Sequence, residues 1–152
     1  MKTIEEEIKQ KKFPDIFVKT NVNLLFTSGW LQNVQARFFK PFGLTQQQYN
    51  VLRILRGQYP KSIKLVQITE RMIDKMSNAS RLIDKLQKKE LVSQIQNPTN
   101  KREVSISITE DGLELLKEID VELAKTVPPI QYKNVSVVEL EQLNLILDKI
   151  RS

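Results

Sequence analysis

The spacing of apolar and polar residues along the sequence predicts a mostly helical chain. Residues 1–12 are expected to form a charged helical extension, because their glutamates precede their lysines in the order that favours a helix. Phe13-Pro14 ends this extension, and a longer helix is predicted from about Asp15 to Phe39. Its apolar residues fall at helical spacing along one stripe, namely Leu24, Leu31, Val34 and Phe38.

Three further helices are predicted in the middle of the chain. Thr45-Gln46-Gln47-Gln48 fits a capping box, which opens a helix that Gly57 and Pro60 close. A short helix at roughly 65–72 and another at roughly 77–89 follow. Polar and basic residues of the 77–89 helix fall opposite one apolar face, which consists of Ala79, Leu82, Ile83 and Leu86.

The apolar period then changes from that of a helix to that of a strand. Val104, Ile106 and Ile108 alternate with serines, and residues 91–96 can pair with them. The residues between the two strands are turn formers and cations, Asn97 to Arg102, so we predict a β-hairpin with a positively charged tip.

Two more helices are predicted after the hairpin. Thr109 caps a helix that runs to about Val127, and Ser136 with Glu139 forms a second capping box that opens the last helix. Apolar residues of the last helix repeat at the spacing of paired helices, at Leu140, Leu143, Leu147 and Ile150. We expect this seam to be a dimer interface; packing within its own subunit is the alternative.

Composition excludes several kinds of chemistry. The chain has 152 residues with neither cysteine nor histidine, so disulfides, thiolate zinc sites and thiol switches are excluded, and the commonest metal ligand is absent. Its four glycines are spread along the chain and form no phosphate-binding loop. We therefore expect no enzyme activity, no cofactor and no metal. No apolar run approaches the roughly 18 residues of a membrane span, so no membrane partner is expected.

The positive charge is unevenly distributed. The net charge is +6, and residues 1–60 and 61–103 each carry +5, whereas residues 104–152 carry −4. A polyanion would therefore bind mainly to the middle third of the chain.

The order of helix, short helix, helix and basic hairpin is that of a winged helix-turn-helix. Small polar side chains at the start of the 77–89 helix would allow close approach to a DNA groove, and Arg81 suits guanine or a phosphate. Lys101 and Arg102 at the hairpin tip would reach a neighbouring phosphate or the minor groove. The candidate DNA-binding residues are Ser77, Asn78, Ser80, Arg81, Lys85, Lys101 and Arg102.

Residues 44–112 resemble the MarR family of bacterial winged-helix transcription regulators. The resemblance is most specific at Leu44-Thr45-x-x-Gln48-x-x-x-Leu52 and at Ile108-Thr109-x-x-Gly112. It implies a dimer in which the first and last helices of both subunits interlock, with the 77–89 helix in the major groove and Arg102 as the wing arginine. Two positions depart from the family: Asn100 replaces its usual Asp, and Glu90 replaces a Gly, so we expect this helix to end differently.

The family resemblance also implies a small aromatic acid as effector. Trp30, Tyr49 and Arg53 are the candidate ligand-binding residues, with Arg53 facing a carboxylate. The alternative is that these are ordinary core aromatics and a surface arginine.

The sequence thus predicts a mainly α fold with a small β-hairpin wing, a winged helix-turn-helix with flanking dimerisation helices. We assign residues 1–43 to N-terminal dimerisation helices, 44–108 to the DNA-binding domain and 109–152 to C-terminal dimerisation helices. The predicted function is a cytoplasmic, nucleoid-associated homodimer that binds a palindromic operator in double-stranded DNA. The alternative is a winged-helix protein-interaction module without specific DNA binding.

Overall fold

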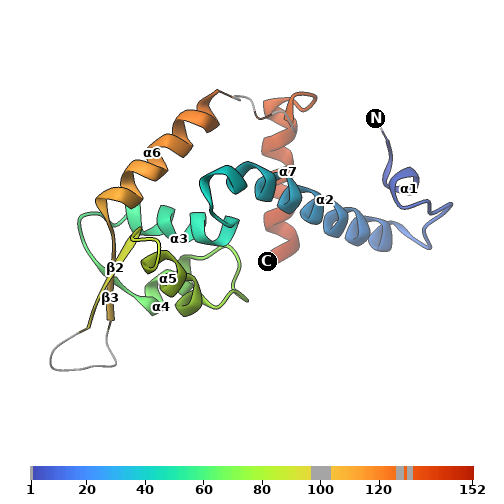
Figure 1. The fold of residues 1–152 in the computed structure, drawn as a ribbon. Coiled ribbons are helices and arrows are strands. Elements are labelled where there is room, and N and C mark those ends of the chain that lie inside the picture. The colour runs from blue at the N-terminus through green and yellow to red at the C-terminus, as the bar shows by residue number, and fades with distance from the viewer. Residues whose placement is uncertain (1, 97–103, 126–128, 130–131) are drawn as a thin grey trace.

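The computed structural model describes the whole chain except residues 1, 97–103, 126–128 and 130–131 (Figure 1). Its elements confirm a mainly helical protein with a small sheet. In chain order they are α1 (Ile4–Glu7), α2 (Ile16–Phe39), the 3-10 helix η1 (Lys40–Phe42), α3 (Gln46–Arg56), β1 (Ile63–Lys64), α4 (Leu65–Arg71), α5 (Ala79–Gln87), β2 (Val92–Gln96), β3 (Val104–Ile108), α6 (Glu110–Ala124) and α7 (Val137–Arg151).

The helix boundaries follow the predicted caps. The hydroxyl of Thr45 accepts a hydrogen bond from the amide of Gln48, and the Gln48 side chain accepts one from the amide of Thr45, which confirms the capping box of α3. Thr109 caps α6, and Ser136 caps α7 in a second box with Glu139. Each cap satisfies an amide that the helix itself leaves without a partner.

The part of the chain from Phe39 to Ile119, called the winged helix body below, is built around one buried cluster of described residues. Seventeen buried apolar residues from Phe39 to Ile119 form it, drawn from the end of α2, from α3 to α5, from the sheet and from α6. The strands lie in the order β1-β3-β2, all antiparallel, with Ile63 opposite Ile106 and Val92 opposite Ile108. The hairpin extends from the body beside α5 (Figure 1).

Three predictions about the elements need correction. The N-terminal extension forms helix only over Ile4–Glu7, and it then turns at Lys9, which adopts a φ of 56°. The sheet has a third strand, β1, which is two residues long and therefore too short for a visible alternation. The predicted helix at 77–89 is shorter at both ends, because Asn78 is its N-cap and Lys88 its C-cap.

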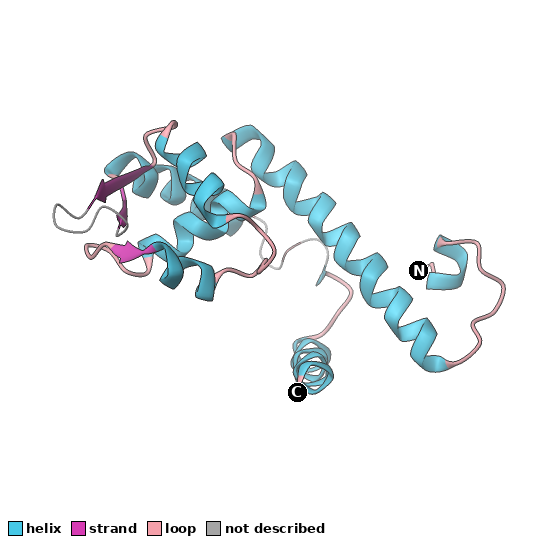
Figure 2. Ribbon diagram, turned by 90° about the horizontal axis from the view of Figure 1, so that it is seen from below, coloured by secondary structure: helices cyan, strands magenta, loops and turns pink. Residues whose placement is uncertain are grey.

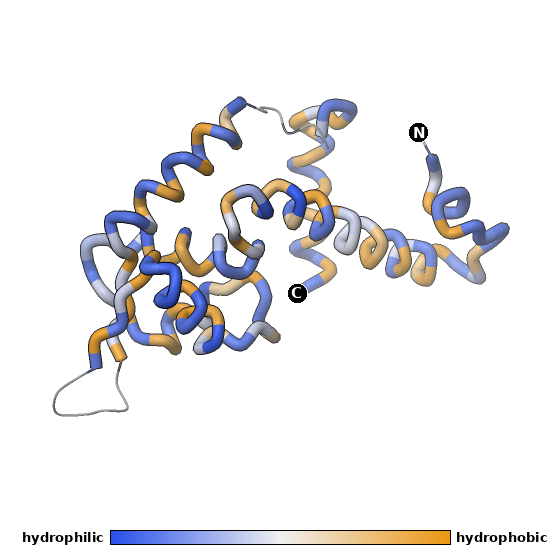
Figure 3. Tube along the Cα trace, viewed as in Figure 1, coloured by the Kyte–Doolittle hydropathy of each residue, from blue (hydrophilic) through white to orange (hydrophobic). Residues whose placement is uncertain are grey.

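The helices α2 and α7 expose apolar surface within one chain. No residue of α7 is buried, and Leu143, Leu145, Ile146 and Ile150 are all at least 45% exposed. Figure 2 shows α7 end-on and apart from the winged helix body, and Figure 3 shows apolar positions along both helices. Within the described chain, Leu143 and Ile150 of the predicted seam are exposed, and Leu140 and Leu147 are half-buried. Among the described residues, no helix combines the length and apolar character needed to cross a membrane.

Candidate nucleic-acid interface

Helix α5 is fixed to the body by one face and presents the other to solvent. Ala79, Ile83 and Leu86 are buried in the core, as their helical spacing predicts. Ser80, Arg81 and Lys85 are exposed on the opposite side, together with Asp84 and Lys88. Within the described residues, the Arg81 guanidinium has no hydrogen bond or ion pair, so its five donors are available to an external acceptor.

The two residues before α5 are used to build its N-terminus. The Asn78 side chain caps the helix by accepting a hydrogen bond from the amide of Arg81, 3.0 Å away. The Ser77 hydroxyl donates to Asp74 Oδ2 at 2.6 Å. Both residues thus lie at the N-terminus where the sequence places them, but their side chains already have partners within the chain. Ser80 and Arg81 are the residues of this end whose side chains remain exposed on the helix.

Asp74 organises the turn between α4 and α5. Besides the Ser77 hydroxyl, its carboxylate accepts a hydrogen bond from the amide of Met76 at 3.0 Å. These hydrogen bonds, that of Ser77 foremost, hold the pKa of the Asp74 carboxyl below its ordinary value, because they favour its charged form. The amide of Ile73 donates to Asn50 Oδ1 on α3 at 3.0 Å, which ties the same turn to the body.

Strand β2 packs on α5 in the core and is also hydrogen-bonded to it through one side chain. Gln94 on β2 donates from Nε2 to Gln87 Oε1 at 2.6 Å and to Asp84 Oδ1 at 3.3 Å. These hydrogen bonds hold β2 against α5. The predicted tip residues Lys101 and Arg102, and Asn100 beside them, lie outside the described residues.

The chain after α5 turns through a residue in the left-handed conformation, Glu90, where the sequence analysis expected a different helix end because Glu replaces a glycine. Glu90 has a φ of 60°, and the amides of Glu90 and Leu91 donate to the carbonyls of Gln87 and Leu86. This is the Schellman arrangement, which usually places glycine at the left-handed position. The expectation of a different helix end is therefore wrong. Burial of both Leu86 and Leu91 in the core holds Glu90 in this conformation.

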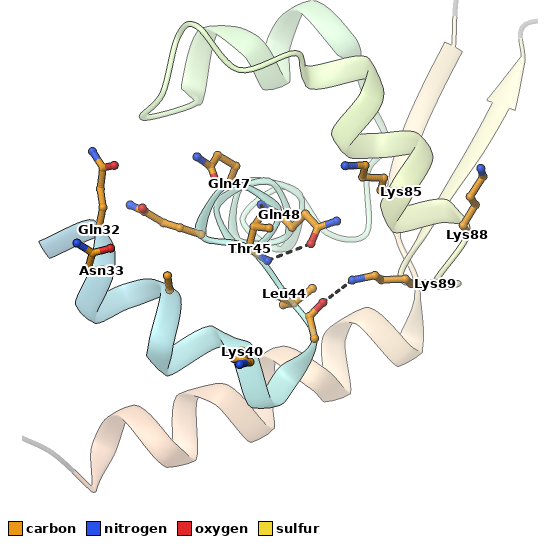
Figure 4. Close-up of a pocket in the computed structure, with 13 residues that line it drawn as sticks. Gln32, Asn33, Lys40, Leu44, Thr45, Gln47, Gln48, Lys85, Lys88 and Lys89 are labelled. Carbon is orange, nitrogen blue, oxygen red and sulfur yellow. Dashed lines mark hydrogen bonds between the residues drawn. The ribbon is translucent and has the colours of Figure 1, made fainter. Parts of the chain in front are cut away.

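A hollow of ≈ 880 Å³ lies between α5, α2 and the start of α3 (Figure 4). Four lysines line it, Lys40 from η1 and Lys85, Lys88 and Lys89 from the end of α5, together with amide and hydroxyl side chains. None of the described residues that line it is acidic. Lys89 reaches the carbonyl of Gly43. The hollow is consequently a region of positive potential next to α5.

The three residues that were predicted to bind an effector do not all line the same site. Tyr49 stacks on Phe39 with ring centroids 4.3 Å apart, and its hydroxyl accepts a hydrogen bond from Arg53 at 3.0 Å. Arg53 also lies 3.6 Å from the Asp120 carboxylate, so a carboxylate of the protein itself faces it. Trp30 instead lines a second hollow with Arg37 and Lys40, which includes neither Tyr49 nor Arg53.

Several residues of this surface were missed by sequence reasoning. Lys40 reaches this surface only through the fold, and Gln94 contacts α5 from the neighbouring strand β2. Asp74 is different, because its partners Met76 and Ser77 are two and three residues away, so the local Asp-x-x-Ser spacing could have marked it. The sequence shows several lysines at the end of the 77–89 helix, but only the folded structure shows that they line one hollow together with Lys40. Among the described residues, no group of three potential ligands is placed to hold a metal ion.

The family follows from comparison with known proteins. Residues 44–104, which span α3 to the first residue of β3, match the sequence profile of the MarR family. This domain belongs to the MarR family. A MarR transcription factor from Planctomyces limnophilus is 29% identical over 90% of this chain and 98% of its own, with a TM-score of 0.68. No curated protein sequence matches the chain.

Two further solved structures share the fold at lower identity. A mutant MarR from E. coli in complex with operator DNA is 21% identical over 90% of this chain and 98% of its own, with a TM-score of 0.75. BpsR from Bordetella bronchiseptica, whose DNA binding is regulated by 6-hydroxynicotinic acid, is 21% identical over 87% and 99%, with a TM-score of 0.66. MarR-family members are transcriptional regulators and not enzymes, which confirms the expected class.

Proposed function

We propose that the chain is a sequence-specific regulator that binds double-stranded DNA through α5. The observation that carries this proposal is the placement of Arg81: it is exposed near the capped N-terminus of α5, and its guanidinium has no partner in the described chain. A planar guanidinium group in that position can donate two hydrogen bonds, to the O6 and N7 acceptors of guanine in the major groove. Ser80 and Lys85 on the same face would contact the adjacent backbone or base edges.

The regulator acts as a homodimer in this proposal. Two surfaces support it, the exposed apolar residues of α7 and those of the outer half of α2, which include Phe17 and Leu25. Several exposed large apolar residues on one helix favour protein association. A two-fold dimer would read a palindromic operator whose half-site centres are on the order of 10 bp apart. A regulator bound in this way would be associated with the nucleoid.

The dimer is tested by sedimentation equilibrium of the purified chain and of Leu143→Arg. We expect the wild type to sediment as a dimer and the variant as a monomer at the same concentration, since the arginine places a charge in the paired seam. The matched control is Lys117→Arg on α6, which preserves the charge and is expected to remain dimeric. A monomeric wild type would contradict the proposal.

A small aromatic acid is the proposed effector, and it would act by releasing DNA. The lysine-lined hollow beside α5 supports an anionic effector, because Lys85 and Lys88 belong to the helix that reads DNA. Titration of the DNA complex with salicylate, with benzyl alcohol as the uncharged control, tests this. Release by the acid alone supports the proposal. If both compounds release DNA equally, or if neither releases it, the proposal of an aromatic acid effector is contradicted.

The DNA-binding proposal itself is tested by selecting bound duplexes from a random pool. Gel shifts of the selected duplex at 50 and 200 mM salt then measure the phosphate contacts. Affinity is expected to fall by roughly 10³-fold or more over this range if six or more phosphates are contacted. A protein-interaction module without specific DNA binding would enrich no sequence and would show no salt-sensitive binding.

A further inference from the structure

Two apolar side chains protrude from the turn that precedes α5. Ile73 is 77% exposed and Met76 is 94% exposed, although Met72 beside them is buried in the core. Single exposed apolar residues are ordinary on a protein surface. Here two of them occur within four residues, in the segment that leads directly into the proposed recognition helix.

The turn that carries them is held in place and cannot readily fold them inward. Asn50 on α3 accepts from the amide of Ile73, and Asp74 accepts from the amide of Met76. Lys75 Nζ donates to the carbonyl of Glu70 at 2.5 Å, which fastens the turn to the end of α4. The turn is therefore held by a hydrogen bond of its own, from Met76 to Asp74, and by contacts with two helices, α3 and α4.

The surroundings favour a polyanion over an apolar protein as the partner. Arg71 precedes the turn in the sequence, Lys75 lies within it and Arg81 follows it, and all three are exposed. The Asp74 carboxylate that lies between them is already engaged by Met76 and Ser77. In the major groove of DNA, the apolar group that a polyanion offers is the C5 methyl of thymine.

We propose that Ile73 and Met76 read thymine methyl groups in the operator and so add to the specificity supplied by α5. The proposal rests on the proposed function, since it requires α5 to lie in the major groove. Apolar contact of this kind is sequence-specific, because uracil presents the same hydrogen-bonding groups as thymine but lacks the methyl. Met76 would make the larger contribution, as its side chain is the more exposed and is next to Ser77 and the helix cap.

The test replaces each thymine of the selected duplex by uracil, one at a time, and measures the affinity of the wild type and of Met76→Gln. At one or more positions in each half-site, we expect uracil to weaken wild-type binding about fourfold, the equivalent of one buried methyl group. Met76→Gln is expected to bind the thymine duplex more weakly and to lose this difference. Ile73→Thr should do the same at a neighbouring position.

Controls separate this proposal from the one on which it rests. Val121→Thr on α6, where Val121 is 53% exposed, should retain the full uracil penalty, and thermal unfolding should show that all variants are folded. Operator binding that is indifferent to uracil at every position overturns this proposal alone. A penalty that persists unchanged in both Met76→Gln and Ile73→Thr also overturns it. Absence of any selective duplex binding overturns the proposed function together with this inference.

Discussion

The side-chain amide of Gln94 on β2 donates a 2.6 Å hydrogen bond to Gln87 on α5. Because Gln94 lies on β2 and Gln87 at the last position of α5, this contact joins the two elements that are proposed to bind DNA. The angle between helix and wing decides whether both reach the same duplex, so this hydrogen bond has a consequence for affinity.

Gln94→Ala should reduce DNA affinity a few-fold and lower the free energy of unfolding by about 1 kcal/mol, the net contribution of one such hydrogen bond. Affinity is measured by fluorescence anisotropy with the selected duplex, and stability by urea unfolding. Gln96→Ala, at the exposed end of the same strand, is the matched control and should leave both quantities close to wild type. Equal effects of the two variants would argue against a specific role for Gln94.

Glu90→Gly should stabilise the protein. A left-handed backbone costs a residue with a Cβ about 1 kcal/mol relative to glycine, and Glu90 has a φ of 60°. The melting temperature is therefore expected to rise by about 2–4 °C. Glu90→Ala keeps the Cβ and should bring no such gain; an equal gain in Glu90→Ala would show that the charge of Glu90, and not its backbone, is unfavourable.

Gly112→Ala should destabilise the protein, because no space exists for a Cβ at this position. A Cβ there would lie 2.4 Å from the carbonyl oxygen of Leu91 and 2.7 Å from the Ile108 side chain. Forced overpacking of this kind typically costs about 1–3 kcal/mol, which urea unfolding can measure. At Gly57 the nearest atom to a new Cβ would be 3.5 Å away, so Gly57→Ala serves as the control and should be tolerated.

The turn before α5 should show a pH dependence that originates in Asp74. Its pKa in the folded chain lies below the ordinary value of 3.8, so the unfolded chain binds this proton more tightly. The carboxylate thus stabilises the fold above about pH 4, and this contribution is lost as the pH falls below 3.8. Asp74→Asn should be less stable than wild type at pH 7, and the difference should shrink toward pH 3. A difference that is constant with pH would contradict this assignment.

The elements that local chemistry determines were predictable from sequence. The capping box of Thr45 and Gln48, the cap at Thr109 and the alternation in 104–108 each specify an element through neighbouring residues. The buried face of α5 likewise followed from its spacing. Strand β1 was not predictable, because a two-residue strand exists only through its pairing with β3.

Other parts of the site were missed for different reasons. Sequence reasoning placed Ser77 and Asn78 at the N-terminus of α5 but overlooked their local partners, Asp74 and the amide of Arg81, which are each three residues away. The left-handed Glu90 is a case in which packing of Leu86 and Leu91 overrides the local preference for glycine. Trp30 was grouped with Tyr49 and Arg53 through the family resemblance; Tyr49 and Arg53 are hydrogen-bonded to each other, whereas Trp30 lines a hollow that includes neither of them.

The central claim, that α5 reads base sequence, is tested most directly by the ratio of affinities for the selected operator and a scrambled duplex of the same composition. Arg81→Ala should lower this ratio by about tenfold or more, while Lys101→Ala in the wing should weaken binding to both duplexes equally. The account is contradicted if Arg81→Ala discriminates between the two duplexes as well as the wild type does.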